Sequence, residues 1–250
     1  DRGKPATEAL ITEILSVRSE VAHALLHLTD WMEPRPVKLP LALRPASAEV
    51  RPRPKGLVLV IGAWNYPVQL ALAPVVGALA AGNTVVLSPS EKAPATAAAL
   101  RELVPQYLDS ALVSVVAGGK ECNTALLAEP WDHILYTGGE RVGRIVYEAA
   151  AKTLSPVTLE LGGKSPAVVT PSRNTGAMAR RIAWAKFTNA GQTCVAPDYV
   201  LAVGEAALRQ VTAELPAALR EFYGDDPRAS RDYGRLISAE HAERLQEMLQ

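Results

Sequence analysis

The loop Asn189-Ala190-Gly191-Gln192-Thr193-Cys194-Val195-Ala196-Pro197 carries one cysteine between a helical pattern and an apolar strand pattern. A loop at the end of a rigid helix can expose a thiol to a cleft, and the thiolate of cysteine attacks carbonyl carbons well at neutral pH. The pattern therefore indicates a nucleophile at Cys194. The alternative is a small buried hydrophobe, which is the commoner role of an isolated cysteine.

Two further side chains could serve the same chemistry. Glu160 stands in the apolar stretch Leu159-Glu160-Leu161, ahead of a glycine pair. A carboxylate buried in a strand has a raised pKa, which suits a general base that activates water. The alternative is a glutamate on the solvent side of the strand. Asn65 lies where a strand pattern gives way to a helix pattern, and its amide could donate to an oxyanion or only cap the helix.

These residues need a framework, and the chain from Leu57 onward alternates short apolar strands with helices. Such strands, joined through helices, form a parallel sheet covered on both faces, with ligands at the carboxyl ends of the strands. The sequence therefore predicts an α/β protein. The expected strands are Leu57 to Ile61, Thr84 to Leu87, Val113 to Val116, Ile134 to Thr137 and Val157 to Leu161; the expected helices are Val68 to Ala81, Ala95 to Tyr107, Cys122 to Leu127 and Val142 to Lys152.

Two strand ends favour a dinucleotide. After the strand at 134–137, the run Gly138-Gly139-Glu140-Arg141-Val142-Gly143 leads into a helix, where backbone amides can face a phosphate. It is not the usual dinucleotide fingerprint, and a plain glycine turn is equally consistent with it. After the strand at 84–87, Glu91 could accept hydrogen bonds from ribose hydroxyls. Its alternative is a glutamate that faces the positive end of a helix dipole.

The flanking segments are simpler. Residues 7–31 predict an amphipathic helix, on which His23 and His27 share a face without a third metal ligand nearby. Six prolines between residues 34 and 55 exclude a helix there and indicate extended strands or an arm. Beyond Pro166 the patterns predict a strand at 167–169, a helix at 177–189 ended by Gly191, a strand at 199–203, and helices at 205–222 and 238–250, the last opened by Ser238.

Composition excludes several classes of protein. Lysine plus arginine and aspartate plus glutamate are both 26 in 250 residues, so the net charge is zero and nothing in the composition indicates a nucleic-acid partner or a polybasic membrane patch. No apolar run reaches the length of a bilayer span, since polar residues, glycine and proline interrupt the uncharged stretch 57–90. Cys122 and Cys194 form no disulfide pattern, which favours a reducing compartment, and we expect a cytoplasmic location. We expect Cys122 to have no role in the chemistry.

Several motifs, taken together and in order, resemble the aldehyde dehydrogenase superfamily. They are Trp64-Asn65-Tyr66-Pro67, Tyr136-Thr137-Gly138, the stretch from Leu159 to Pro166, and Gly191-Gln192-Thr193-Cys194. The continuations Cys194-Val195-Ala196-Pro197-Asp198-Tyr199, Phe222-Tyr223-Gly224 and Ser230-Arg231-Asp232-Tyr233-Gly234-Arg235 are similar to its class 3 branch. The similarity covers nearly the whole chain.

This resemblance implies a fold and a set of roles. It implies an open parallel-sheet, Rossmann-like domain at 1–160 that binds NAD, or NADP, followed by the first part of an α/β catalytic domain at 161–250. Cys194 would be the nucleophile, Glu160 the base and Asn65 an oxyanion donor; Lys164 and Thr193 would be structural neighbours. The cofactor contacts it implies are Trp64, Ser88, Glu91, Gly138, Gly139, Glu140, Arg141, Val142, Gly143 and Leu161.

The resemblance also carries departures and rival functions. Members usually have lysine at Ser88 and serine at Gly139, and loss of the lysine would weaken cofactor binding by about 1–2 kcal/mol. Glu91 would disfavour a 2′-phosphate, which predicts a preference for NAD. The resemblance implies an aldehyde substrate, a homodimer at full length and a chain that lacks both ends of the family's length. A catalytically silent relative, or a cofactor-free cysteine hydrolase, remains open as an alternative.

Overall fold

The computed structural model describes residues 3–171 and 173–248. The chain divides into two compact units. The sheet unit runs from Thr12 to Glu160, and the cysteine unit combines the residues up to Ile11 with Leu161 onward. The first eleven residues thus group with the second half of the chain, while the functional division at 160/161 stays a prediction.

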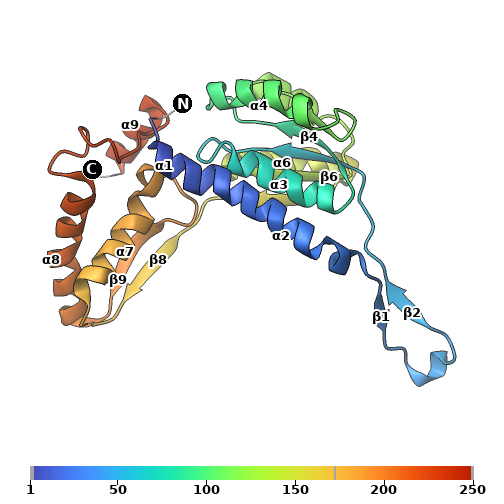
Figure 1. Cartoon of the computed structure of the whole chain (residues 1–250), viewed down its shortest axis with the longest axis horizontal. Helices are drawn as coiled ribbons and strands as arrows, with labels where there is room; N and C mark the ends of the chain where they lie inside the picture. Colours follow the sequence, from blue (N-terminus) through green and yellow to red (C-terminus); the bar gives the residue numbers. More distant parts are fainter. Residues whose placement is uncertain (1–2, 172, 249–250) are drawn as a thin grey trace. The chain divides into compact units, whose positions relative to one another are not determined.

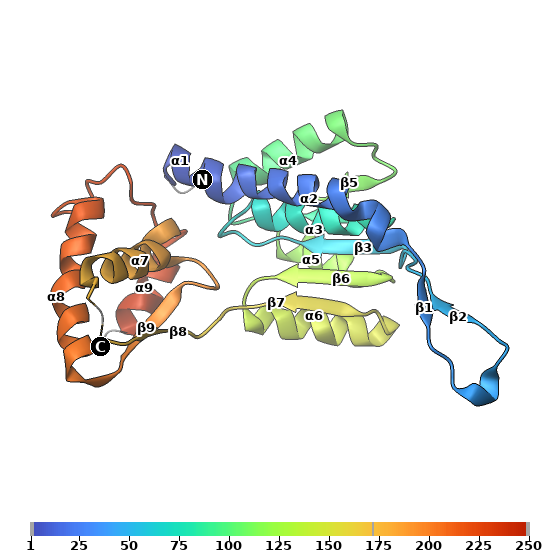
Figure 2. The same ribbon diagram turned by 60° about the horizontal axis from the view of Figure 1, so that its bottom comes forward.

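A five-stranded parallel sheet forms the centre of the sheet unit, with strand order β5-β4-β3-β6-β7. Figure 2 shows β3, β6 and β7 side by side. The predicted alternation of strands and helices is confirmed, with ends shifted by one or two residues. The strands are β3 Leu57–Ile61, β4 Thr84–Ser88, β5 Val113–Val115, β6 His133–Thr137 and β7 Val157–Glu160, and the connecting helices are α3 Gln69–Ala80, α4 Pro94–Tyr107, α5 Lys120–Leu126 and α6 Glu140–Thr153.

The core of the sheet unit follows from alternation along the strands. Val58 and Val60 of β3 face α3 and α4 and pack in one aliphatic cluster with residues of β4 and β5. Leu59 pairs in register with Ile134 of β6, and both are buried on the opposite face. Because β6 leads to β7 in the direction opposite to that of β3 to β4, right-handed crossovers place α6 on this second face.

A long helical run precedes the sheet. The predicted helix at 7–31 is confirmed, but a π-helical turn at Leu10–Ile14 separates α1 Ala6–Ala9 from α2 Leu15–Met32. Helix α2 packs along α3 (Figure 1).

The proline-rich stretch forms the expected arm, in which β1 Arg35–Val37 pairs antiparallel with β2 Ala48–Val50 around a 3-10 turn at Leu41–Leu43. Both strands are exposed along their length, and the arm extends away from the sheet (Figures 1 and 2).

The cysteine unit has a smaller core of its own. Strands β8 Ser165–Val169 and β9 Pro197–Ala202 pair in parallel, and helices α7 Thr175–Phe187 and α8 Gly204–Tyr223 pack together and against them. Alanines at the contact between α7 and α8 are almost fully buried, which lets the two helices approach closely. The helix α9 Ala239–Glu247 begins as predicted at Ser238, whose hydroxyl accepts from the His241 backbone; residues 249–250 of that prediction lie outside the described residues.

Candidate active site and nucleotide edge

The carboxyl ends of the five strands lie along one edge of the sheet, and most of the predicted site residues of the sheet unit stand there. The chain builds β3, β4 and β5 outward and then returns to place β6 beside β3, so the strand order reverses between β3 and β6. Ligands of open α/β sheets bind at such a reversal. The segment after β3 and the glycine turn after β6 flank this point, as the sequence predicted for a ligand edge.

Asn65 lies in the loop between β3 and α3, and both Trp64 and Asn65 are partly exposed there. The loop ends at Val68, whose backbone N–H donates to Oε2 of Glu13 over 2.8 Å. Glu13 belongs to the π-helical turn and is only 5% exposed, so a buried carboxylate caps the start of α3. This contact fixes the chain directly after Asn65, and the sequence pattern of the N-terminal helix did not reveal it.

Glu160 is the last residue of β7, and its side chain is exposed. The expectation of a carboxylate buried inside an apolar strand is therefore wrong. The strand ends at this residue, so the Glu160 side chain is not covered by the helices that pack on the faces of the sheet. Its backbone is nevertheless tied to the neighbouring strand end, because the Gly138 N–H donates to the Glu160 carbonyl over 2.9 Å. Leu161, which follows, is partly buried.

The glycine turn after β6 could hold a phosphate. Gly139 precedes α6, and among the described residues no side chain caps this helix. The first-turn N–H groups of Glu140, Arg141 and Val142 therefore form the uncapped, positive end of a 14-residue helix dipole. A Cβ at Gly139 would meet no described atom within 4 Å. The turn can thus approach a phosphate closely. Gly143 is buried one turn later and lets α6 pack.

Tyr136 packs against this turn and is hydrogen-bonded to it. Its side chain is buried, its hydroxyl donates to the Gly139 carbonyl over 3.3 Å, and a Cβ at Gly138 would lie 2.2 Å from that hydroxyl. Burial raises the pKa of the Tyr136 phenol, and the negative charge of Glu91 adds to the effect. The phenol therefore stays protonated as a donor to the turn.

The end of β4 supplies the other two cofactor candidates. Ser88 is completely buried, and its hydroxyl donates to Oδ1 of Asn123 over 2.7 Å. The short side chain is thus engaged inside the unit, and a cofactor contact from it stays a prediction. Glu91 is exposed three residues later and precedes α4. A contact from its carboxylate to a ribose stays a prediction.

Cys194 is exposed on a loop of unusual backbone conformation. Helix α7 ends at Phe187, earlier than the predicted Asn189, and three consecutive residues then have positive φ: Asn189 at 57°, Ala190 at 53° and Gly191 at 77°. Asparagine and glycine tolerate this region, but alanine there costs about 1–2 kcal/mol. Strain of this kind persists only where surrounding contacts hold it.

Gln192 supplies those contacts. Its Nε2 donates to the carbonyls of Asn189 (2.9 Å) and Arg235 (3.1 Å), and its Oε1 accepts from the Ile237 N–H at 2.9 Å. The side-chain amide of Asn189 donates in turn to the Gln192 carbonyl over 3.2 Å. The amide group of Gln192 thus clamps the cysteine loop onto the segment that precedes α9. Gly163 packs on its other side, because a Cβ there would lie 2.3 Å from the Cys194 carbonyl oxygen.

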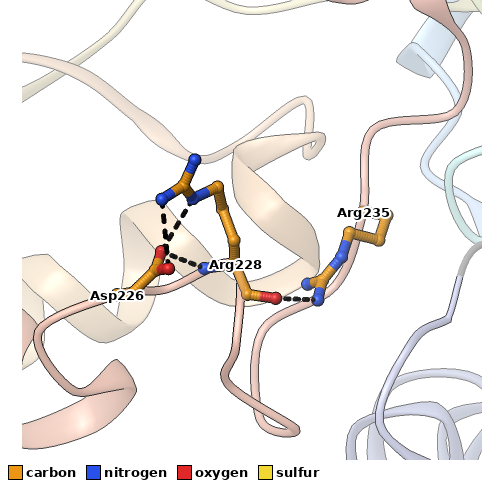
Figure 3. A network of polar contacts seen from close by, with 3 residues as sticks. All are labelled: Asp226, Arg228 and Arg235. Carbon is orange, nitrogen blue, oxygen red and sulfur yellow. Dashed lines mark hydrogen bonds and ion pairs between the residues drawn. The ribbon is translucent and has the colours of Figure 1, made fainter.

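The segment that receives this clamp is ordered by arginines. Arg228 pairs with Asp226 through two side-chain bonds, and Arg235 donates to the Arg228 carbonyl over 2.7 Å (Figure 3). Hydrogen bonds from Arg228 lower the pKa of Asp226 below its usual value. These charged groups are exposed, so each pair adds little to the free energy of unfolding. Together they hold the backbone of the segment to which the Gln192 side chain is hydrogen-bonded.

Other predicted residues have simpler surroundings. Lys164 is exposed and Thr193 partly buried. His27 stacks on Trp31 along α2, and His23 lies tilted against both rings. Among the described residues no group of three or more potential ligands could hold a metal. Cys122, on α5, is partly buried and unpaired.

Comparison with known proteins decides the family. A model of the aldehyde dehydrogenase family matches residues 1–250. The chain belongs to the aldehyde dehydrogenase family. It is 48% identical over 249 residues to mouse aldehyde dehydrogenase family 3 member B2, and 46% identical over 249 residues to the rat protein named "aldehyde dehydrogenase, dimeric NADP-preferring". The match covers 100% of this chain but 52% and 55% of these relatives, so the chain spans about half their length.

Solved structures of aldehyde dehydrogenases agree with this assignment and confirm the fold class. A substrate-bound Staphylococcus aureus AldH matches with a TM-score of 0.92 and 42% identity over 100% of this chain and 54% of that one. A Mycobacterium tuberculosis aldehyde dehydrogenase complexed with NAD+ matches with a TM-score of 0.82 and 32% identity over 99% and 51%. The resemblance to the class 3 branch, drawn from the motifs, is confirmed by the family 3 relatives.

The site residues themselves belong to different units of this family member. Asn65 and Glu160 stand at the edge of the sheet unit, whereas Cys194 stands in the cysteine unit. Their convergence on one substrate, and the individual roles assigned from the sequence, stay predictions. Within the described residues, no helix is both long and apolar enough to cross a lipid bilayer.

Proposed function

We propose that the protein carrying this chain oxidises an aldehyde to a carboxylic acid with NAD or NADP. The observation that carries the proposal is an exposed cysteine on a strained, clamped loop, in a chain that matches the aldehyde dehydrogenase family along its whole length. A strained backbone held by several hydrogen bonds is typical of functional sites. The uncapped start of α6 beside the strand-order reversal supports a dinucleotide at the sheet edge.

The chain's own residues have distinct tasks toward the cofactor. The amides of Glu140, Arg141 and Val142 would hold a phosphate, with Gly138 and Gly139 permitting close approach. Trp64, Leu161 and Gly143 would line the remainder of the site. When bound, the dinucleotide would accept a hydride. Glu91 would bind the adenosine ribose hydroxyls.

The chemistry then follows from three side chains. The thiolate Sγ of Cys194 forms a bond to the aldehyde carbon, and the carbonyl oxygen gains the negative charge as the carbonyl π bond breaks. The Asn65 side-chain amide and the Cys194 backbone N–H donate to that oxygen. Collapse of the oxyanion would pass the hydride of that carbon to the bound oxidised dinucleotide and leave a thioester on Cys194.

Hydrolysis completes the cycle. Glu160 takes a proton from water as the water oxygen attacks the thioester carbon, and the C–S bond breaks to release the acid and return the thiolate. The exposure of Glu160 in the sheet unit gives water direct access to it. The net reaction consumes aldehyde, oxidised cofactor and water and yields acid, reduced cofactor and a proton.

Cofactor choice depends on Glu91. Its exposed carboxylate would repel a 2′-phosphate, so we propose that NAD binds more tightly than NADP, unlike what the name of the rat relative says of that protein. Fluorescence titration with both cofactors measures this preference, and tighter binding of NADP would refute it. We also propose that the full-length protein is a homodimer, in keeping with the word "dimeric" in the name of the rat relative. We propose a reducing, cytoplasmic location in which Cys194 stays reduced.

Matched cysteine variants test the whole proposal. Cys194→Ser should abolish NAD-dependent NADH formation from an aldehyde while NAD still binds, and Cys122→Ser should keep full activity. An active Cys194→Ser protein would overturn the assignment. Ester cleavage without cofactor would instead indicate a cysteine hydrolase.

One observation favours a second candidate, a silent relative that keeps the fold for binding or assembly. The Ser88 hydroxyl is buried and donates to Asn123, at a position where the family usually has lysine, so the cofactor contact of that lysine would be missing. Absence of both NAD binding and turnover in the wild-type protein would support this candidate.

A further inference from the structure

We propose that Glu8, near the start of the chain, is a positioning residue for the loop that carries Cys194. Its Oε1 accepts the backbone N–H of Asn189 over 2.9 Å, across a sequence separation of 181 residues. Both residues belong to the cysteine unit. The inference rests on the proposed function only in that it treats Cys194 as the reacting group; the contact itself is independent of any ligand.

The backbone at Asn189 explains why an outside acceptor is needed. Helix α7 ends at Phe187, and Thr188 is already extended with ψ at 134°. Asn189 then enters the left-handed region, so its N–H no longer points along the helix toward a carbonyl one turn back. Asn189 is only 2% exposed, and a buried backbone donor requires a partner. A carboxylate is a strong one, because hydrogen bonds to charged acceptors are the shorter and stronger class.

The position of Asn189 is passed on to the cysteine through Gln192. The carbonyl and side chain of Asn189 both bond to Gln192, which stands two residues before Cys194. Gln192 is in turn bonded to the segment at 235–237. Glu8 therefore holds the entry to the strained turn, while Gln192 holds its exit. Loss of either contact frees the turn to relax toward an unstrained backbone, which would move the thiol.

The surroundings of Glu8 provide a spectroscopic marker. Tyr223 and Tyr233 form a ring cluster with Phe187, with 4.9 Å between the two tyrosine centroids. Burial, followed by the negative charge of Glu8, raises the pKa of Tyr223 to about 12. Asp232 and Tyr233 also act on Tyr223, and Arg235 faces Tyr233. Removing the charge of Glu8 should thus lower the pKa of Tyr223. This pKa is measured from the absorbance of the phenolate as pH rises, and the measurement does not depend on whether the protein has activity.

The experiment compares three variants in the protein that carries this chain. Glu8→Ala removes the acceptor, Glu8→Gln keeps a carbonyl acceptor without the charge, and Glu20→Ala removes an exposed carboxylate from α2 as the matched control. Hydrogen exchange is followed at the amides of 188–194. The rate at which iodoacetamide modifies Cys194 is measured by mass spectrometry, with Cys122 as the internal reference.

The expected result is local. In Glu8→Ala the amide of Asn189 should exchange about tenfold faster or more, and the Cys194-to-Cys122 ratio of alkylation rates should change severalfold. Glu8→Gln should restore both toward wild type while still lowering the Tyr223 pKa, and Glu20→Ala should change neither. In an active protein, kcat should fall in Glu8→Ala with the KM for NAD unchanged.

Unchanged exchange and alkylation in Glu8→Ala would overturn the inference. If Glu8→Gln showed the same exchange and alkylation rates as Glu8→Ala, the inference would also be overturned, because a carbonyl acceptor would then not replace the carboxylate. If Glu8→Ala fails to fold, the comparison of Glu8→Gln with wild type decides in the same way. Failure of the proposed function has a different signature, namely a wild-type protein without NADH formation in which the exchange and alkylation results still hold.

Discussion

The adjacent glycines 162 and 163 allow one added methyl group to test how closely the nucleophile loop is packed. A Cβ at Gly163 would lie 2.3 Å from the Cys194 carbonyl oxygen and 3.5 Å from its carbon, whereas a Cβ at Gly162 would meet no described atom within 4 Å. Neither glycine has a positive φ. Gly162→Ala is therefore a matched control for Gly163→Ala, with the same added atom one residue away.

The magnitude follows from this contact. Real Cβ atoms essentially never come within 3.0 Å of a heavy atom, so the Cys194 carbonyl and the new methyl must separate by at least 0.7 Å. The carbonyl is backbone and cannot rotate away as a side chain would. Overpacking of this kind costs about 1–3 kcal/mol of unfolding free energy, and a displacement near 1 Å at a reacting group lowers the rate about 100-fold.

Three measurements follow the effect in both variants. Urea denaturation gives the unfolding free energy, iodoacetamide gives the reactivity of Cys194 relative to Cys122, and absorbance of NADH gives turnover. Gly163→Ala should lose stability and change Cys194 reactivity, while Gly162→Ala should match wild type within about 0.5 kcal/mol. Equal behaviour of the two variants would refute the close packing of Gly163 on the cysteine loop.

Three further changes test separate features. Leu154 ends α6 in the left-handed region at φ 56° with its side chain 88% exposed, so Leu154→Gly should raise the unfolding free energy by about 0.5–1 kcal/mol in urea denaturation; a loss would contradict this. Because the folded state holds the Tyr223 pKa at about 12 against 10 when unfolded, stability should fall as pH rises from about 10 to 12, and Tyr223→Phe should flatten that fall in thermal melts. Burial lowers the pKa of His133 below 6.5, so stability should decline as pH drops through 6.5; His133→Asn should remove this decline, and an unchanged profile would exclude His133 as its source.

Much of the fold could be read from local patterns. The strands at 57–61 and 133–137 are short, have apolar residues at their centres and are each followed by a glycine, and that information lies within a few residues of each element. The parallel sheet then follows from chain connectivity, because strands joined through helices run in one direction. The glycine turn at Gly138 and Gly139 was predicted for the same reason, since its conformation depends on residues adjacent in sequence.

Tertiary structure alone decided how the candidate site is held. The acceptor for Asn189 lies 181 residues away at Glu8, and the cap of α3 comes from Glu13, 55 residues before Val68. No periodicity or motif reports such pairs, because they depend on how distant segments pack and not on local backbone preference.

Glu160 shows the same division between local pattern and packing. An acid among apolar residues was expected to be buried, and the sequence by itself determined that a strand passes through this stretch, although it predicted the strand to continue to Leu161. Its exposure was decided by the strand ending at that residue, at the open edge of the sheet. Residue type and order thus determined which groups are available for chemistry, and packing across long sequence separations decided which of them are buried, strained or held.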